Sequence, residues 1–265
     1  MATKKVAIVT GSSGGIGRAI AEKLAQEGVT VVITSRTKKT ADEVALLIRE
    51  TGGDALGAEF NLDESGSGSD LISYVLSKLG RIDYLVNNAV SHPTLPPLPF
   101  EALNAELIQA GVNANLTNTL LLTHAAYPSL NGTQGAVLNI GSAVVNRHIE
   151  GIPLYAIIKG ALSQATKVLA AEWAKDGIRV NQLNPGFTQT EAYKNIGITK
   201  EQADAVFAYY QGFHAQNRVG QPEEIAETAA FLLSDHSKWT TGTIVDVDGG
   251  LSIQAVPAPS AGIDG

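Results

Sequence analysis

The chain has 265 residues, of which 44% are hydrophobic and 17% charged, with 27 glycines, 10 prolines and no cysteine. This composition excludes a wholly disordered chain. The length fits one large α/β domain or two small ones and is enough to bury a sizeable core. The lack of cysteine excludes disulfides, a thiol nucleophile and cysteine-bound metal sites. The formal net charge of −7 opposes a nucleic-acid partner, because such a partner requires a basic surface.

The beginning of the chain and its hydropathy predict the compartment. No apolar run reaches the roughly 18 residues that a membrane span requires. The N-terminal segment MATKKVAIVTG passes from a short polar start into an apolar run, which leaves no room for a signal peptide. We therefore expect a cytoplasmic protein with no membrane partner.

Short β-rich runs alternate with helical patterns along almost the whole chain. We expect strands over residues 6–9, 29–33, around 58, 82–86, 136–140, 178–183 and 243–247. Gly28 is predicted to end the first helix, and Thr40 with Glu43 to form a capping box for the second. Pro222 is expected in the first turn of a helix after Gly220. This alternation predicts an α/β fold, with residues 1–265 in a single doubly wound Rossmann-type domain around a central parallel sheet of about seven strands.

Two stretches are expected to have roles outside this alternation. The chain has seven tyrosines and six phenylalanines, and five of these thirteen residues lie in the range 190–220. They are Tyr193, Phe207, Tyr209, Tyr210 and Phe213. This enrichment predicts a substrate lid with an apolar inner face, although the same rings could pack two short helices onto the body. The tail, residues 255–265, is rich in proline, alanine and glycine, and we expect it to be flexible or to pack on a neighbouring subunit.

A glycine-rich turn, TGSSGGIG at residues 10–17, joins the first predicted strand to the first helix. Glycines allow a sharp turn and a close approach of a diphosphate, which binds the free amides of the helix N-terminus. Such a turn can also be purely structural. Its place in the first strand–helix unit favours dinucleotide binding.

The second predicted strand ends in Thr34, Ser35 and Arg36, with no acidic residue to bind a ribose 2′-hydroxyl. An arginine at this place accommodates a 2′-phosphate, and Ser35 and Lys38 could add contacts. The alternative is a solvated arginine on a loop. The sequence therefore predicts NADP(H) as the cofactor in preference to NAD(H).

A phenol and an ammonium, those of Tyr155 and Lys159, are four residues apart and share one face of a predicted helix. A nearby cation stabilises a phenolate and lowers the pKa of the tyrosine, which makes it a usable acid or base. Ser142 follows the predicted strand 136–140, at the edge where open α/β sheets bind their ligands. Its hydroxyl can donate a hydrogen bond to a carbonyl oxygen as negative charge develops there.

Six pieces of sequence together resemble the short-chain dehydrogenases/reductases, and the chain is similar in architecture to 3-oxoacyl-carrier-protein reductases. The pieces are TGSSGGIG at 10–17, NNAV at 87–90, Asn115 in NANLTN, Ser142, Tyr155 with Lys159, and NPGFTQT at 184–190. They occur in the order of the family and span residues 6 to about 250.

The resemblance implies a role for each residue of a catalytic tetrad. Tyr155 would donate a proton to the substrate oxygen while a hydride arrives from the nicotinamide. Ser142 would polarise the carbonyl group. Lys159 would hold the nicotinamide ribose and lower the pKa of Tyr155, and Asn115 would hold a water that connects Lys159 to solvent.

The resemblance also implies a set of cofactor contacts. Besides Tyr155 and Lys159, they are Gly11, Ser13, Gly15, Ile16, Gly17, Ser35, Arg36, Asn61, Leu62, Asn88, Ala89, Pro185, Gly186 and Thr188. Two residues depart from the pattern of the family: Val90 replaces its usual glycine, and Asn61 replaces the acidic residue near the adenine. Asn61 can still exchange hydrogen bonds with the adenine.

These features predict an NADP(H)-dependent oxidoreductase that reduces a ketone with an apolar or aromatic group to a secondary alcohol, and also runs the reverse oxidation. An alternative is an NAD-linked secondary alcohol, sugar or steroid dehydrogenase. A further alternative is a non-catalytic dinucleotide sensor, because fold does not imply function. The histidines show no ligand spacing, so no metal is assigned. The resemblance also implies a homotetramer or homodimer.

Overall fold

The computed structural model describes residues 4–190 and 199–254. Within them, seven parallel strands form one sheet in the order β3-β2-β1-β4-β5-β6-β7. The strands are β1 (Val6–Val9), β2 (Thr30–Ser35), β3 (Ala55–Glu59), β4 (Tyr84–Asn87), β5 (Ala136–Ile140), β6 (Arg179–Pro185) and β7 (Ile244–Val247). The predicted doubly wound α/β fold with about seven parallel strands is confirmed.

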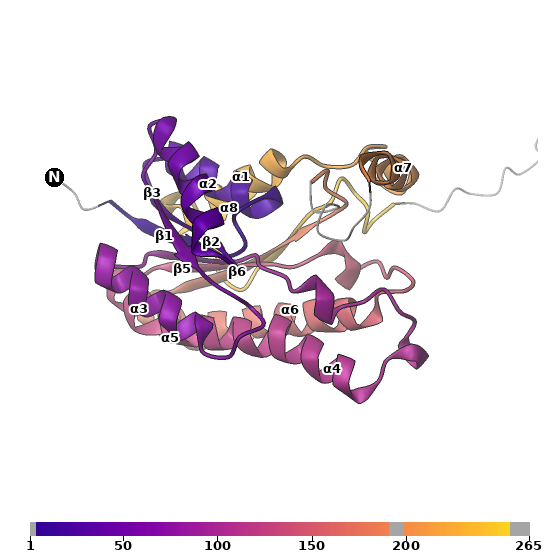
Figure 1. Ribbon diagram of the computed structural model, residues 1–265, viewed down its shortest axis with the longest axis horizontal. Coiled ribbons are helices and arrows are strands. Elements are labelled where there is room, and N and C mark those ends of the chain that lie inside the picture. Colours follow the sequence, from indigo (N-terminus) through magenta and orange to yellow (C-terminus); the bar gives the residue numbers. More distant parts are fainter. Residues whose placement is uncertain (1–3, 191–198, 255–265) are drawn as a thin grey trace, which may run out of the picture.

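The central strands are buried along their whole length because helices cover both faces of the sheet. All residues of β1, β4 and β5 are buried. On one face lie α1 (Gly15–Gln26), α2 (Lys38–Glu50) and α8 (Pro222–Leu233); on the other lie α3 (Ser67–Leu79), α5 (Asn118–Thr133) and α6 (Pro153–Trp173) (Figure 1). The side chains of these helices form two cores, with Ile20 and Ala229 in the first and Leu71 and Leu122 in the second.

Two further helices and several short turns complete the described chain. They are α4 (Ala105–Val112), α7 (Lys200–Gln211), a π-helical turn (Asn113–Thr117) and 3-10 turns at His92–Thr94, Phe100–Ala102, Ala143–Val145, Ala174–Asp176 and Asp235–Ser237. α4 and α7 lie at the same end of the molecule in Figure 1, with α7 beyond the carboxyl end of β6. No helix in the described ranges is long and apolar enough to cross a membrane.

The helix ends test three of the local predictions. Gly28, with φ of +82°, follows the last turn of α1, as predicted for a glycine beyond a helix C-terminus. Pro222 is the first residue of α8, as expected. The capping box predicted at Thr40 is wrong, because α2 begins one turn earlier and Thr37 is its N-cap, with a side chain that accepts a hydrogen bond from the Thr40 amide.

The strand order reverses next to β1, which pairs with β2 on one side and β4 on the other. After β1 the chain crosses to β2 on one side of β1, whereas after β4 it continues to β5 on the other side. The loops that follow β1 and β4 therefore run apart. In open α/β sheets a crevice for ligands forms at this point, outside the carboxyl ends of the strands. The turn after β1 meets the loop after β4 closely: a Cβ on Gly11 would lie 3.0 Å from the Cα of Ala89.

Candidate active site

The glycine turn between β1 and α1 has the geometry of a diphosphate-binding turn. Gly11 and Gly15 have φ of +63° and +56°, in the left-handed region that favours glycine. A Cβ on Gly17 would overlap the side-chain nitrogen of Asn88. The N-cap of α1, Gly14, provides no side-chain cap, so the amides of the first turn are available to an anion. These residues fit the diphosphate of a dinucleotide.

The loop after β4 holds the glycine turn through Thr10. The Thr10 hydroxyl donates to the Val86 carbonyl (3.0 Å) and accepts from the amides of Asn88 (2.9 Å) and Ala89 (3.0 Å). The Asn88 side chain donates in turn to the carbonyl oxygens of Thr10 (2.8 Å) and Gly11 (3.2 Å). The predicted residues Asn88 and Ala89 therefore lie against the turn, and Asn88 supports its backbone.

The end of β2 is also connected to this turn. Ser12 donates from its hydroxyl to the Val9 carbonyl (2.7 Å) and accepts from the Thr34 amide (3.0 Å), while the Gly11 amide donates to the Thr34 hydroxyl (2.9 Å). Of the other predicted contacts, Ser13 and Ile16 are partly exposed in the turn and at the start of α1. The cross-bonded backbone gives the phosphate end of the cleft a defined shape.

The residue expected to choose between the two dinucleotides lies on the surface. Arg36 follows β2, is exposed, and has no hydrogen bond or ion pair with any residue of the described ranges. Ser35 is half-buried beside it. Lys38, predicted as an additional contact, instead forms an ion pair with Asp42 at 2.7 Å. The exposed Glu59 pairs with Ser35 in the register of β2 and β3, its carboxylate accepts from the Lys38 amide (3.4 Å), and this acidic group next to Ser35 was missed from the sequence.

The predicted adenine residues are used to close a turn after β3. The Asn61 side chain donates to Glu64 (2.7 Å) and accepts from the Asp63 amide (3.2 Å). Leu62 is buried, and its carbonyl accepts from Asn118 on α5 (2.8 Å). Hydrogen bonds from Asn61 to an adenine would therefore have to replace or share these contacts.

The residues predicted to contact the nicotinamide lie at the end of β6 and in the loop after it. Pro185 is the last residue of β6, and a Cβ on Gly186 would lie 2.8 Å from the Cα of Asp248, so only glycine fits there. The Thr188 hydroxyl donates back to the Gly186 carbonyl (3.1 Å). This loop reaches the glycine turn as well, because a Cβ on Gly15 would lie 3.5 Å from the Cβ of Thr190.

Ser142 and Tyr155 form the chemical centre of the site. Ser142 comes directly after β5 and caps the 3-10 turn Ala143–Val145, where its hydroxyl accepts from the Val144 amide (3.3 Å). Burial raises the pKa of Tyr155 above its ordinary value, and the nearby Ser142 hydroxyl opposes that rise. The tyrosine is therefore held in its protonated form, as a proton donor must be.

Lys159 lies one helical turn beyond Tyr155 on α6 and is only 6% exposed. Its Nζ donates to the Ile140 carbonyl at 2.6 Å and lies 5.6 Å from the centroid of the Tyr155 ring. Burial lowers the pKa of Lys159 to about 8. The expected net lowering of the Tyr155 pKa is not found, because loss of water around the phenol has the largest effect.

Asn115 lies in the π-helical turn between α4 and α5, a distortion that is frequent at functional sites. Its side chain accepts from the Ser91 amide (2.8 Å) and donates to the Ser91 carbonyl (3.3 Å), the Thr94 hydroxyl (2.9 Å) and the Gly111 carbonyl (3.2 Å). Asn115 therefore fixes the turn at residues 91–94. Its expected role in holding a water next to Lys159 stays a prediction.

The turn that Asn115 holds carries a histidine to which the sequence assigned no role. Loss of surrounding water and, to a smaller extent, the positive charge of Lys159 lower the pKa of His92, whose side chain is exposed. The influence of Lys159 on this residue is one that a single histidine without a spacing pattern could not indicate. Beside it, an apolar cluster surrounds Tyr155. The cluster contains Val90, Leu95, Leu103, Val112, Leu116, Leu154 and Ile158.

Three of the aromatic residues expected to form a lid, Tyr209, Tyr210 and Phe213, contact one another with ring centroids 5.1–5.9 Å apart. Tyr210 stacks on Phe187 with ring centroids 3.6 Å apart, and Phe213 lies under the Arg147 guanidinium at 5.5 Å. Tyr209 is 66% exposed. Tyr193 and the tail at residues 255–265 lie outside the described residues. The ring contacts favour the packing interpretation for Tyr210 and Phe213; the lid stays a prediction.

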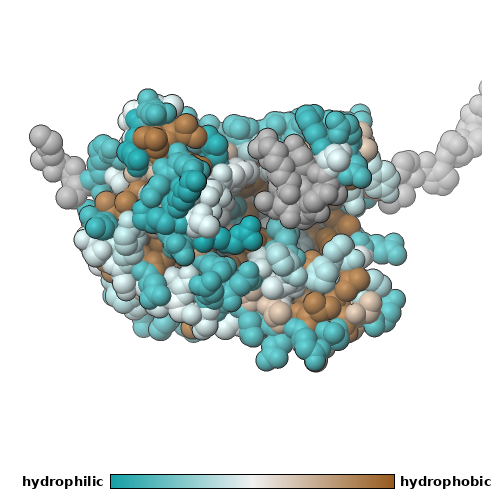
Figure 2. Space-filling model, in the orientation of Figure 1, coloured by the Kyte–Doolittle hydropathy of each residue, from teal (hydrophilic) through white to brown (hydrophobic). Residues whose placement is uncertain are grey.

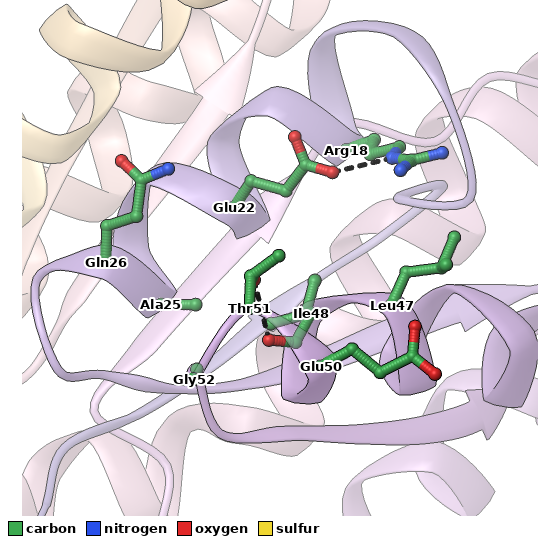
Figure 3. Close-up of a pocket in the computed structure, with 10 residues that line it drawn as sticks. Arg18, Glu22, Ala25, Gln26, Leu47, Ile48, Glu50, Thr51 and Gly52 are labelled. Atoms are coloured by element: carbon green, nitrogen blue, oxygen red, sulfur yellow. Dashed lines mark hydrogen bonds and ion pairs between the residues drawn. The ribbon is translucent and has the colours of Figure 1, made fainter.

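A groove of about 640 Å³ lies elsewhere, between α1 and α2. In Figure 3, the ion pair of Arg18 and Glu22 on α1 faces Leu47 and Glu50 of α2. None of the predicted catalytic or cofactor-binding residues lines this groove. The crevice at the carboxyl ends of the strands is therefore the candidate site.

Comparison with known proteins agrees with this geometry. A family model described as enoyl-(acyl carrier protein) reductase matches residues 11–252. Glucose 1-dehydrogenase 2 of Bacillus subtilis is 35% identical over 257 residues, covering 95% of this chain and 96% of that protein. The 3-oxoacyl-[acyl-carrier-protein] reductase of Synechocystis sp. is 35% identical over 253 residues, covering 94% and 97%. The chain belongs to the short-chain dehydrogenase/reductase family.

A solved structure supports the same assignment. The gluconate 5-dehydrogenase from Burkholderia cenocepacia, determined in complex with NADP and tartrate, superposes with a TM-score of 0.85 at 30% identity, covering 95% of this chain and 96% of that one. As a short-chain dehydrogenase/reductase, the chain is an oxidoreductase acting on alcohol or carbonyl groups, and its cofactor is a nicotinamide dinucleotide.

Proposed function

We propose that this enzyme reduces a ketone to a secondary alcohol with NADPH, and catalyses the reverse oxidation with the same residues. The observation that carries the proposal is the buried Lys159 ammonium 5.6 Å from the Tyr155 ring, with Ser142 beside this tyrosine at the carboxyl end of β5. A proton donor, a second hydroxyl and a cation then meet where the sheet opens to its ligands.

The reduction requires one hydride and one proton. Bound NADPH supplies the hydride to the carbonyl carbon. The Tyr155 hydroxyl donates its proton to the carbonyl oxygen, and the Ser142 hydroxyl donates a hydrogen bond to the same oxygen as its negative charge develops. The raised pKa of Tyr155 keeps this proton in place before the reaction.

Lys159 acts on the tyrosine rather than on the substrate. When Tyr155 gives up its proton, the ammonium 5.6 Å from the ring stabilises the phenolate. Because the pKa of Lys159 is about 8, this group can also exchange a proton near neutral pH. Asn115 keeps the neighbouring turn in place, and with it His92.

The preference for NADPH rests on Arg36. An exposed guanidinium without a partner in the described chain is free to form a bidentate contact with a 2′-phosphate. The neighbour from Burkholderia cenocepacia, which has the same fold, was determined with NADP.

The surroundings of Tyr155 indicate the substrate class. Val90, Leu95 and Leu103 form an apolar wall in the cluster against which Tyr155 packs. Figure 2 shows further hydrophobic surface near α4, where Phe100 and Ile108 are exposed. A ketone with an apolar or aromatic group fits this wall better than a charged sugar acid does.

A second candidate is an NAD-linked secondary alcohol or sugar dehydrogenase. The observation that favours it is Glu59, an exposed carboxylate paired with Ser35 at the edge of the 2′-position. A carboxylate there repels a 2′-phosphate and accepts a hydrogen bond from a 2′-hydroxyl. The Arg36 guanidinium favours a 2′-phosphate instead. The relative strength of the Arg36 and Glu59 interactions therefore decides the preference between NADPH and NADH.

We also propose that the enzyme is a homodimer or homotetramer in the cytoplasm. Leu121 on α5 and Ile157 and Val168 on α6 are large apolar side chains that are 44–55% exposed. Such residues on neighbouring helices are typical of interfaces. Light scattering coupled to size-exclusion chromatography measures the mass directly, and a mass of one chain would contradict this proposal.

The decisive experiment follows NADPH and NADH oxidation by the purified enzyme with a β-keto ester, a quinone, an aromatic ketone, a steroid and a keto sugar. Tyr155→Phe is expected to lower kcat/KM by about 10²–10⁴-fold while leaving NADPH binding unchanged. Tyr127→Phe is the matched control, because it removes a phenol hydroxyl that binds Asp176 away from the site. A Tyr155→Phe variant with the parent rate would contradict the mechanism, and cofactor binding without turnover would favour a sensor.

A further inference from the structure

A continuous line of buried polar side chains crosses the sheet beneath Ser142. It begins on β4, where Asn87 donates to Asn139 of β5 at 2.8 Å. Asn139 donates to the hydroxyl of Thr166 on α6 at 2.9 Å, and this hydroxyl meets the Gln182 side-chain oxygen at 3.2 Å. All four side chains are at least 95% buried.

The line continues along β6 and ends on a carboxylate. Gln182 donates to the side-chain oxygen of Asn184 at 2.8 Å, and Asn184 donates to Asp246 on β7 at 2.9 Å. Gln182 and Asn184 are fully buried, whereas Asp246 is exposed at the far edge. These last amides donate in the same direction, toward the negative charge, and aligned hydrogen bonds in a medium of low dielectric constant strengthen one another.

Ser142 is attached to this line at its charged end. The Ser142 amide donates to the Asn184 side-chain oxygen at 3.1 Å. The other end of the same segment is attached as well, because the Asn146 side chain donates to both oxygens of Asp246 at 3.1 and 2.9 Å. Asp246 therefore holds the segment 142–146 at two points, once directly and once through Asn184.

The space around Gly141, the residue before Ser142, shows how closely the Gln182 and Asn184 side chains pack against this segment. A Cβ on Gly141 would overlap the side-chain oxygen of Asn184 and the side-chain nitrogen of Gln182. Amides buried in a central strand destabilise the fold unless they are hydrogen-bonded, and apolar side chains would fill the same space without that cost. Asn184 accepts from the Ser142 amide directly, whereas Gln182 donates to Ser163 on α6 (2.6 Å) and to the same Asn184 oxygen (2.8 Å), so both amides fix the group that holds Ser142.

We propose that Gln182, Asn184 and Asp246 are positioning residues for Ser142, with the Asp246 carboxylate as the anchor of the catalytic segment. This inference rests on the proposed function, since Ser142 must meet both Tyr155 and the substrate oxygen. The carboxylate polarises the Asn184 amide, so that the Asn184 oxygen becomes a stronger acceptor for the Ser142 amide. A small displacement of a positioned group lowers the rate far more than it lowers binding.

The test compares Asp246→Ala, Asp246→Asn and Asn184→Ala with the parent enzyme. We expect Asp246→Ala and Asn184→Ala to lower kcat at least tenfold, with KM for the ketone and Kd for NADPH within twofold. Asp246→Asn retains an oxygen that can accept from Asn184, so it is expected to recover most of the lost rate. Asp54→Asn, which removes a surface carboxylate that pairs with Lys4, is the matched control and keeps the parent values.

Hydrogen exchange provides a readout that needs no substrate. Peptides covering residues 141–147 are expected to exchange faster in Asp246→Ala than in the parent, while peptides from α2 are unchanged. Asn146→Ala, at an exposed position, removes only the direct attachment and is expected to give a smaller change in the same direction. Because Asn146 is exposed, its variant keeps the test valid even if Asp246→Ala or the buried Asn184→Ala does not fold.

Two results would overturn the inference. One is a parent-like kcat in Asp246→Ala and Asn184→Ala in an assay where Tyr155→Phe is inactive. The other is unchanged exchange at residues 141–147 in Asp246→Ala or Asn146→Ala. A fully active Tyr155→Phe variant contradicts the proposed function instead, and the exchange experiment then still decides whether Asp246 holds the segment.

Discussion

The two ends of the cofactor crevice are built in opposite ways. At the catalytic end, Lys159 and Asn115 are more than 90% buried, and Ser142, Lys159 and Asn115 all have hydrogen bonds that fix them to the surrounding chain. At the ribose-phosphate end, Arg36 and Glu59 are exposed, and Arg36 has no partner within the described ranges.

The difference follows from what each end must do. Proton and hydride transfer depend on distances between reacting atoms, so misplacement by about 1 Å reduces the rate by orders of magnitude. Choosing between a phosphate and a hydroxyl depends mainly on the sign of nearby charge, which a mobile surface side chain provides. The catalytic end therefore buries polar and charged groups, which lowers folding stability but fixes their positions. The phosphate end leaves its charged groups exposed and has no such cost.

The largest expected effect comes from Lys159→Met, which removes the buried ammonium and keeps the shape. We expect ketone reduction to fall at least about 10²-fold, because the phenolate loses its cation. At pH 7 the free energy of unfolding is expected to rise by up to about 3 kcal/mol. Burial lowers the pKa of Lys159 from 10.5 to about 8, and each unit corresponds to about 1.4 kcal/mol. Urea unfolding measures this change.

Lys167→Met is the matched control for this substitution, since Lys167 is an exposed lysine on the same helix. It should leave both activity and stability near the parent values. A Lys159→Met variant that is less stable than the parent would show that the bond to Ile140 outweighs the burial of charge.

The pH dependence tests the same group without a substitution. Lys159 has a lower pKa in the folded chain, about 8, than in the unfolded chain. Between pH 8 and about 10.5 the unfolded chain binds the additional proton, so this residue makes the fold more stable as pH rises. Ketone reduction is expected to decline several-fold through the same pH of about 8, as the ammonium loses its charge. A kcat/KM profile that stays flat from pH 7 to 9 would contradict this assignment.

A smaller effect is expected from Arg36→Asp at the other end of the crevice. The substitution should weaken NADPH binding at least about tenfold and improve NADH binding, because charge-assisted contacts to phosphate contribute about 1.5–3 kcal/mol. Fluorescence titration with each cofactor measures both constants. Arg49→Asp, at an exposed arginine on α2 that donates to the Ala55 carbonyl, serves as a control for the change of charge.

The smallest expected effect is that of Glu59→Gln. Removing a like charge next to the 2′-phosphate should strengthen NADPH binding about two- to fivefold at low salt, and the gain should shrink as ionic strength rises. Affinities measured at two salt concentrations check this. A loss of NADPH affinity would place Glu59 among the groups that support Arg36.

Local patterns in the sequence were sufficient for features that depend on neighbours along the chain. The spacing of Tyr155 and Lys159 predicted their common helix face, and the position of Ser142 after an apolar run predicted its place at the strand end. The capping box at Thr40 was wrong because two threonines three residues apart can each begin the helix, and only the backbone shows that Thr37 does so.

The sequence by itself determined the doubly wound fold and the glycine turn, because strand and helix periodicity and spacings of a few residues encode them; the catalytic tetrad stays a prediction from the resemblance to the family. Only the tertiary structure decided that Asn61 is used in its own turn, that Glu59 lies beside Ser35 and that Asp246 reaches Ser142 through Asn184. Asn184 and Asp246 are 62 residues apart and meet because β6 and β7 pair in parallel. The polar residues within β6 could be recognised in the sequence as candidates for buried hydrogen bonds. Their partners could not, because these depend on strand register, which is a property of the whole sheet.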